Sequence, residues 1–293
     1  MNQKNFEFLR DQIKFTGFGE GLENALQQKI KEGTPTFQLE HSGKFNNDQV
    51  STSLQFKKSE QTDMYFFNSY KVDLQKEDGG AALSQNFYIN KENNITLKEA
   101  YNLMDGRAVN KDLKNAEGQV YNAWLKMDFK ESDASGNFKM QQYHQNYGYD
   151  LEATLAKHPI KELETPNYKD SLLASLKKGN MQSVTFKVNG EEVKQFVEAN
   201  PHFKTVNVYD DSMKRISTRE VKDQKQGEGQ KEQSVKDLKK DKKEENAVTL
   251  DESSKKSLEK NSVKQFNYLW ISQVPFRISL QVFKMISESV LHI

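Results

Sequence analysis

The stretch from residue 218 to residue 263 places the firmest limit on what this chain can fold into. It holds 12 Lys and Arg and 11 Asp and Glu in 46 residues, with no aromatic residue and only scattered Val, Leu and Ala. Such a composition cannot bury enough apolar surface to offset the conformational entropy of the chain. We therefore expect a charged, disordered linker over 218–263, with transient helix within 235–246 as the alternative. The stable fold is expected within residues 1–217.

Residues 1–217 form a body of nearly balanced charge, with 28 Lys and Arg against 30 Asp and Glu. This balance disfavours a surface that coats DNA without sequence preference. The chain has no cysteine, which excludes disulfides, thiolate zinc sites, iron–sulfur clusters and cysteine nucleophiles. The absence of cysteine points to a reducing compartment, and no secretory signal is visible at the start. We therefore expect a cytoplasmic protein.

Helix and strand patterns alternate through the first half of the body. Apolar residues recur at helical spacing over 5–14 and again over 22–32, where Gly33 ends the pattern. After that the apolar period changes to two, which predicts antiparallel strands over 36–39, 51–57, 64–74 and 83–89. Thr96 and Glu99 match a capping box that opens a helix through Met104.

The second half continues this mixture of short helices and strands. Strands are predicted over 121–129, 138–143 and 205–209, and Asp150 and Thr165 are placed to cap two helices. Asn189 and Gly190 predict a type I′ hairpin turn. That turn sets two pairs of residues opposite each other: Phe186 with Val193, and Lys187 with Glu192.

These patterns predict an α+β protein with two small units of antiparallel sheet and short helices. We expect an N-terminal unit over 1–92, a C-terminal unit over 93–217, the linker over 218–263 and an apolar tail over 264–293. Pro275, Arg277 and Lys284 interrupt the tail, so it falls short of a transmembrane span. Three alternatives remain for the tail: a helix that docks on a partner, a helix on a membrane surface, and an extension with no selected role.

Patterns for catalysis and metal binding are weak. The five histidines occur singly, so no two imidazoles are spaced to share one helical face. Gly17, Gly19 and Gly21 precede a helix but lack the Gly-Lys-Ser/Thr ending of a phosphate loop. Oxygen ligands over 209–212 are explained more simply by a turn. We therefore predict no catalytic residue, no metal and no cofactor.

Two segments carry groups suited to binding. Segment 105–112 brings guanidinium, amide and ammonium donors together, as a phosphate or carboxylate site would; a solvated polar loop is the competing interpretation. Segment 143–149 mixes aromatic faces with polar tips, as a base-stacking or peptide-docking surface would; tyrosines that complete a small core are the competing interpretation. The candidate binding residues are Arg107, Asn110, Lys111, Tyr143, His144 and Tyr147.

Several segments of the body resemble a known group of proteins. They lie at residues 5–19, 63–68, 96–113, 121–124, 144–163, 182–186 and 198–204. They are similar to uncharacterised, domain-of-unknown-function proteins carried on conjugative transposons and related mobile elements of Bacteroidota. The resemblance covers nearly all of residues 1–217 and implies no catalytic residues. It also implies a polar, charge-rich end, from which 264–293 departs, as a shifted reading frame or recombination would explain.

The resemblance and the residue patterns together predict a non-enzymatic accessory protein of a mobile genetic element. We expect it to act through protein–protein contacts in transfer or maintenance of the element. The element's nucleic acid is the alternative partner, and a counter-defence effector or enzyme with no recognisable motif is the alternative class. The nearly neutral body favours a protein partner over DNA.

Overall fold

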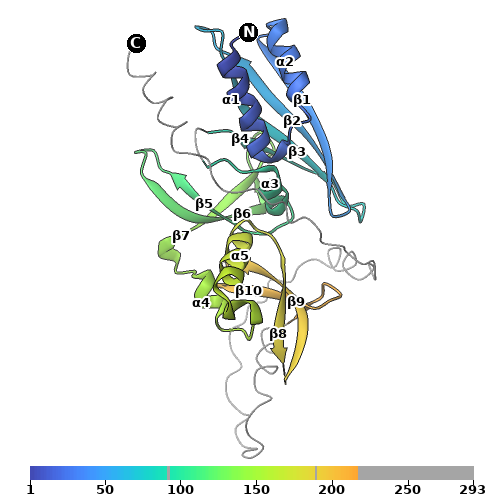
Figure 1. The fold of residues 1–293 in the computed structure, drawn as a ribbon, viewed down its shortest axis with the longest axis vertical. Helices are drawn as coiled ribbons and strands as arrows, with labels where there is room; N and C mark the ends of the chain where they lie inside the picture. Colours follow the sequence, from blue (N-terminus) through green and yellow to red (C-terminus); the bar gives the residue numbers. More distant parts are fainter. Residues whose placement is uncertain (91–92, 189, 217–293) are drawn as a thin grey trace, which may run out of the picture. The chain divides into compact units, whose positions relative to one another are not determined.

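The computed structural model describes residues 1–90, 93–188 and 190–216. Within this part, short helices accompany three small antiparallel sheets, so the predicted α+β class is confirmed (Figure 1). The predicted linker over 218–263 and the predicted tail over 264–293 lie outside the described residues. Among the helices that the structure describes, none combines the length and the apolar character needed to cross a membrane.

Two helices begin the chain where the apolar spacing predicts them. The first, α1 (Gln3–Ile13), starts after Asn2, whose side chain accepts a hydrogen bond from the backbone N–H of Asn5. A π-helical turn, η1 (Lys14–Phe18), follows it. The second, α2 (Glu23–Glu32), ends at Gly33, which has the left-handed φ of 73° typical of a helix C-terminus.

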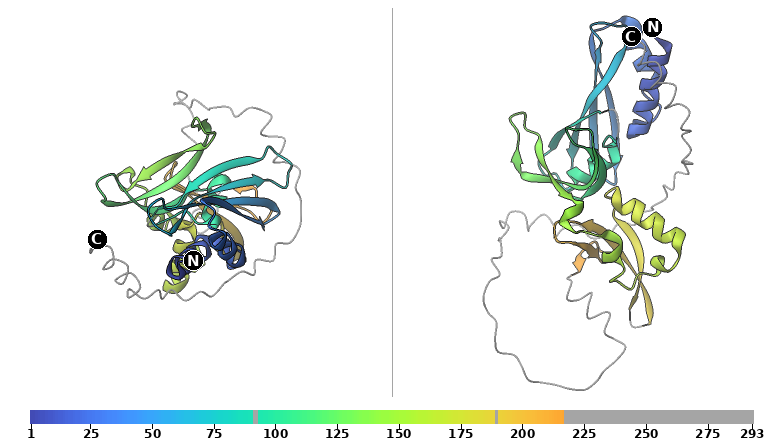
Figure 2. Two further views of the ribbon diagram at one scale, coloured as in Figure 1. Left: turned by 90° about the horizontal axis from the view of Figure 1, so that it is seen from above. Right: turned by 90° about the vertical axis from the view of Figure 1, so that its left-hand side faces the viewer.

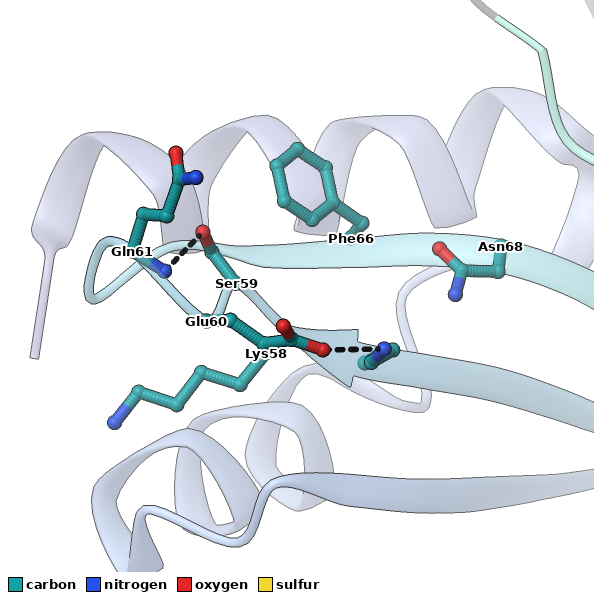
Figure 3. A pocket seen from close by; sticks show the side chains of 7 residues that line it. Lys58, Ser59, Glu60, Gln61, Phe66 and Asn68 are labelled. Atoms are coloured by element: carbon teal, nitrogen blue, oxygen red, sulfur yellow. Dashed lines mark hydrogen bonds and ion pairs between the residues drawn. The ribbon is translucent and has the colours of Figure 1, made fainter.

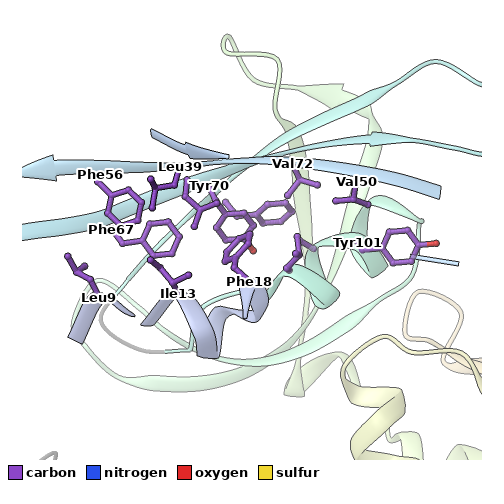
Figure 4. Packing of buried hydrophobic residues seen from close by; sticks show 14 of the residues in the cluster. Leu9, Ile13, Phe18, Leu39, Val50, Phe56, Phe67, Tyr70, Val72 and Tyr101 are labelled. Atoms are coloured by element: carbon purple, nitrogen blue, oxygen red, sulfur yellow. The ribbon is translucent and has the colours of Figure 1, made fainter. Parts of the chain in front are cut away.

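Sheet A is a meander of four strands in the order β1-β2-β3-β4. The strands are β1 (Thr36–Phe45), β2 (Asp48–Lys58), β3 (Tyr65–Gln75) and β4 (Leu83–Tyr88). Their side chains alternate between a buried and an exposed face, and α1 and α2 cover the buried face (Figures 1 and 2). Figure 4 shows Leu9 and Ile13 of α1 beside Phe67 of β3. Each such fully buried side chain contributes about 1.5–3 kcal/mol.

Helix α3 (Leu97–Met104) opens with the predicted capping box. The Glu99 carboxylate accepts a hydrogen bond from the Thr96 N–H, and the Thr96 hydroxyl accepts one from the Glu99 N–H. Sheet B follows, with strands β5 (Val109–Lys114), β6 (Val120–Ser132) and β7 (Phe138–His144) in that order. The interpretation of 105–112 as a joining loop needs correction from Val109 onward, because these residues pair with β6. Apolar and polar residues do not alternate regularly enough over 109–114 to predict a strand from the sequence.

One apolar cluster joins sheet A, the first three helices and one face of sheet B. It includes Leu103 and Met104 of α3 and Leu125 and Met127 of β6, together with side chains of β1 to β4. The cluster therefore draws on both sides of the predicted boundary between 1–92 and 93–217. The division of the body into two folding units, 1–92 and 93–217, therefore remains a prediction.

The remaining elements surround a second apolar cluster. They are η2 (Gln145–Tyr147), α4 (Leu151–Leu155), η3 (Lys161–Glu164), α5 (Pro166–Lys177), β8 (Gln182–Val188), β9 (Glu191–Asn200), β10 (Thr205–Tyr209) and β11 (Arg215–Ile216). The four strands form sheet C in the order β11-β10-β9-β8. Asp150 caps α4 as predicted, by accepting a hydrogen bond from the Ala153 N–H.

The predicted register of the β8–β9 hairpin is confirmed, although Asn189 of its turn lies outside the described residues. Phe186 lies opposite Val193, and Lys187 lies opposite Glu192. The two charged residues nevertheless form ion pairs elsewhere. Lys187 pairs with Glu164 and Glu192 pairs with Lys161, so η3, rather than the opposite strand, neutralises them.

Candidate functional site

The three candidates of the first binding segment are held by neighbouring side chains. Arg107 is only 9% exposed, and its Nη2 lies 2.8 Å from Oδ2 of Asp105. Lys111 is half-buried beside the buried Glu99, with Nζ 3.0 and 3.2 Å from the two carboxylate oxygens. Asn110, on β5, exchanges two hydrogen bonds of 2.7 and 2.9 Å with the side chain of Asn122 on β6.

Arg107 belongs to a cluster of charges around the ring of Tyr101. Its guanidinium carbon lies 5.4 Å from the ring centroid, while the Tyr101 hydroxyl donates to Oδ2 of Asp48 at 2.9 Å. Lys76 forms ion pairs with both Asp48 and Asp105. The contact between Arg107 and Asp105 is ionic rather than a directional hydrogen bond, because Nε and Nη2 of Arg107 have no hydrogen-bond partner among the described residues. These four charged side chains, Lys76, Arg107, Asp48 and Asp105, thus compensate one another.

Lys98 completes this cluster without a carboxylate of its own. Its Nζ lies 4.8 Å from the ring centroids of both Phe45 and Tyr101, and it makes no ion pair within the described part of the chain. Although the residue as a whole is exposed, desolvation of its ammonium group, and then the charge of Arg107, lower the pKa of Lys98 from 10.5 to about 8. Desolvation, followed by the charges of Asp105 and Asp48, raises the pKa of Tyr101.

The structure separates the three candidates of the second binding segment. Tyr143 and Tyr147 come together, with ring centroids 5.0 Å apart. His144 instead packs against Tyr121, at 5.1 Å. Successive side chains of a strand point to opposite faces, so Tyr143 and His144 on β7 cannot share one surface. The sequence interpretation of 143–149 as one surface therefore applies to the two tyrosines and not to His144.

The two tyrosines meet residues of the turn between β9 and β10. The Tyr143 Oη and the His202 Nδ1 are 2.9 Å apart, and the Tyr147 hydroxyl donates to the backbone oxygen of His202 at 2.7 Å. The Nζ of Lys204 lies 4.5 Å from the ring centroid of Tyr147. Phe203 packs edge-on against His202 at 4.5 Å but is 66% exposed. We call these five residues the aromatic patch: Tyr143, Tyr147, His202, Phe203 and Lys204.

The turn that carries Phe203 is fixed by hydrogen bonds. The Lys204 N–H donates to the Pro201 carbonyl at 3.0 Å, and the side chain of Asn200 accepts from the Phe203 N–H at 3.4 Å. Lys204 has a φ of 51°, an uncommon left-handed conformation for a residue other than glycine. Desolvation, and then the neighbouring Tyr147, raise the pKa of the Tyr143 hydroxyl. The patch thus presents ring surfaces whose polar tips are already bonded within the protein.

The sequence offers a weak signal for the second half of the patch. Asn200 and Pro201 predict a turn over 200–204 and nothing more. An aromatic residue at the tip of a turn between two strands cannot reach the core beneath the sheet, so Phe203 is the residue that could have been noticed. The approach of Tyr147 to this turn, where it bonds to His202 and lies beneath Lys204, depends on the tertiary fold.

A shallow pocket of about 250 Å³ lies where β2 turns into β3 (Figure 3). Phe66 and Asn68 line one side, and Lys57 and Glu60 form a surface ion pair of 3.1 Å at its rim. Both side chains of this ion pair are exposed to solvent, so the pocket holds no buried acid or base of the kind that catalysis uses. In the ranges that the structure describes, no three His, Asp or Glu side chains gather as metal ligands would.

No family model, curated protein or solved structure matches this chain. The functional conclusion therefore depends on the geometry of the aromatic patch and on the chemistry of its residues.

Proposed function

We propose that this chain is a non-enzymatic accessory protein of a mobile genetic element that binds another protein through the aromatic patch. The link to a mobile genetic element is supported by the sequence resemblance described above, and the protein-binding role is supported by the aromatic patch. A cytoplasmic location belongs to the same proposal and is supported by the absence of cysteine.

The exposed ring of Phe203 is the observation that carries this proposal. Protein interfaces are enriched in aromatic residues at their centres, because a large rigid ring buries much apolar area at a small cost in side-chain entropy. Phe203 is 66% exposed on a hydrogen-bonded turn and packs against His202, to whose backbone oxygen Tyr147 donates a hydrogen bond. A partner that covers these rings would not need to reorder the turn.

A nucleic-acid partner is the second candidate, favoured by the position of Lys204. Its ammonium group lies over the Tyr147 ring, and a lysine beside exposed rings suits a stacked base and its phosphate. Only one lysine belongs to the patch, and the body has a net charge of −2. Binding of single-stranded DNA by the full chain is therefore expected to be weaker than micromolar at physiological salt. Tight binding that falls steeply as salt rises would instead support the nucleic acid.

Site-specific photocrosslinking tests the proposal. The photoreactive residue p-benzoylphenylalanine replaces Phe203 in one full-length variant and Tyr168 of α5 in a matched control, since Tyr168 is 65% exposed. In cells that carry the element, we expect an ultraviolet-dependent adduct of one defined mass at position 203 and none at position 168. The adduct should survive nuclease and be lost with protease. Equal adducts at both positions, or none at 203, would contradict the proposal, and an adduct removed by nuclease would favour the alternative partner.

A further inference from the structure

Strand β1 forms one edge of sheet A, and no other strand of the described ranges pairs with its outer side. It is the first strand in the order β1-β2-β3-β4, it runs for ten residues, and among the described strands it pairs only with β2. An open edge of this length exposes a row of backbone N–H and C=O groups that a further strand can bind. No hydrogen bond within the described part of the chain uses the backbone N–H of Gln38, Glu40, Ser42 or Lys44.

Two other edge strands of this fold, β4 and β8, are covered. At β4, the backbone N–H of Asn86 donates to the side chain of Asn137, and the side chain of Gln85 accepts from the N–H of Phe138. At β8, the Lys187 N–H donates to the Pro159 carbonyl and the Thr185 N–H donates to the carboxylate of Glu162. The open edge of β1 thus differs from the edges of β4 and β8, where these hydrogen bonds block pairing with a further strand.

The hydrogen bonds to β2 determine which residues of β1 face outward. The Lys58 N–H donates to the Pro35 carbonyl at 2.7 Å, and the Thr52 hydroxyl donates to the His41 carbonyl at 2.9 Å. Phe45 and Asp48 close the hairpin across a two-residue turn. Odd-numbered residues therefore bond to β2. Because backbone groups alternate in direction along a strand, the even-numbered residues point theirs at the open edge.

The same even-numbered residues carry their side chains on the exposed face of sheet A. Two of them, Glu40 and Lys44, are oppositely charged, and neither makes an ion pair within the described ranges. Consider a second copy of β1 placed antiparallel beside the first, with Ser42 opposite the Ser42 of that copy. Glu40 of each copy then lies directly opposite Lys44 of the other, at the separation at which cross-strand charge pairs interact.

We propose that β1 is a self-association edge, at which two copies of this chain join antiparallel strands into one continuous eight-stranded sheet. The three central pairs of outward-facing residues supply about six backbone hydrogen bonds, and two Glu40–Lys44 pairs select the register. The competing register with Glu40 opposite itself would give a longer ladder but brings two carboxylates together, which is unfavourable. The chemistry of the edge therefore selects a second copy of this chain as its occupant.

Charge reversal on the full chain tests this register. Glu40→Lys and Lys44→Glu each convert both cross-strand pairs into like-charge pairs. Each single variant should therefore dimerise at least about tenfold more weakly than the wild type in sedimentation equilibrium. An equimolar mixture of the two single variants should recover the dimer, because the lysine introduced at position 40 of one chain then faces the glutamate introduced at position 44 of the other. The double variant E40K/K44E should also recover it.

The matched control reverses Lys71 and Asp73, an ion pair of 3.2 Å on the central strand β3, and should leave the dimer unchanged. Ser42→Pro removes an outward N–H at the centre of the edge without removing a bond to β2, and should abolish the dimer while circular dichroism stays unchanged. A wild type that remains monomeric at about 200 μM would overturn the proposal. So would association that the single variants do not weaken, or that their mixture does not restore.

Discussion

Replacing Gly179 with alanine tests the contact between the end of α5 and the α3–β5 region. Gly179 has a φ of +78°, a left-handed conformation that costs a residue with a Cβ about 1–2 kcal/mol. An added Cβ would lie 2.9 Å from the Ala108 carbonyl oxygen, 2.9 Å from Cγ2 of Val109 and 3.1 Å from Cβ of Asn102. A backbone carbonyl and a β-branched side chain can move only a little to make room for the added atom. Such overpacking costs about 1–3 kcal/mol. We expect Gly179→Ala to lower the free energy of unfolding by about 2–5 kcal/mol.

Gly33 provides the matched control for this substitution. It also follows a helix and has a φ of +73°, but an added Cβ would meet no atom of the described residues within 4 Å. Gly33→Ala should therefore lower the free energy of unfolding only by the cost of the left-handed backbone conformation, about 1–2 kcal/mol. The difference between the two variants isolates the close approach of α5 to its neighbours.

Urea unfolding of the full-length variants, followed by circular dichroism, measures both changes. For a protein of this size, 1 kcal/mol corresponds to about 2–4 °C in the melting temperature, so a thermal scan should separate the two variants as well. If Gly179→Ala and Gly33→Ala are equally destabilising within about 0.5 kcal/mol, the close packing at Gly179 does not contribute as described.

Three further predictions concern capping, pH and the extent of the fold. Thr96→Ala should destabilise the protein by about 1 kcal/mol through loss of the capping box, whereas Thr165→Ala should change stability little because Thr165 makes no capping hydrogen bond; equal losses in urea unfolding would contradict this. Lys98 loses its proton near pH 8 in the folded state and near its ordinary value of 10.5 when unfolded. Between these values the unfolded state binds more protons, so the free energy of unfolding gains a contribution that rises with pH. Lys98→Met should remove that contribution between pH 8 and 10, and an unchanged pH profile would contradict the lowered pKa. A fragment of residues 1–217 should unfold cooperatively on heating, since its caps and turns agree with one another; a scan without a cooperative transition would refute this.

Local signals were sufficient for much of the fold. The capping box at Thr96 and Glu99 and the β8–β9 register follow from residues close together in sequence. The meander of sheet A follows from a period of two, because one of its faces is buried and the other is not. β5 could not be found this way, since its polar residues Asn110 and Lys111 are satisfied by Asn122 and Glu99 rather than by solvent.

The candidate site was only half predictable, for a similar reason. Tyr143 and Tyr147 are near neighbours in sequence, and their mixture of ring and hydroxyl identified them. The exclusion of His144 follows from strand alternation once β7 is assigned. The contribution of His202, Phe203 and Lys204 depends on β9 and β10 bringing a distant turn beside η2, which no local pattern encodes.

The affinity of the photocrosslinked partner for two alanine variants tests the protein-binding role of the aromatic patch most directly. The partner, once purified, is titrated against the full-length wild type, Phe203→Ala and the control Tyr168→Ala by isothermal titration calorimetry. A central interface aromatic contributes about 2 kcal/mol or more, so Phe203→Ala should weaken the affinity about 30-fold or more. Tyr168→Ala, which removes an equally exposed ring from α5, should leave it within about twofold. Equal affinities for all three proteins would contradict the assignment of the patch as the binding surface.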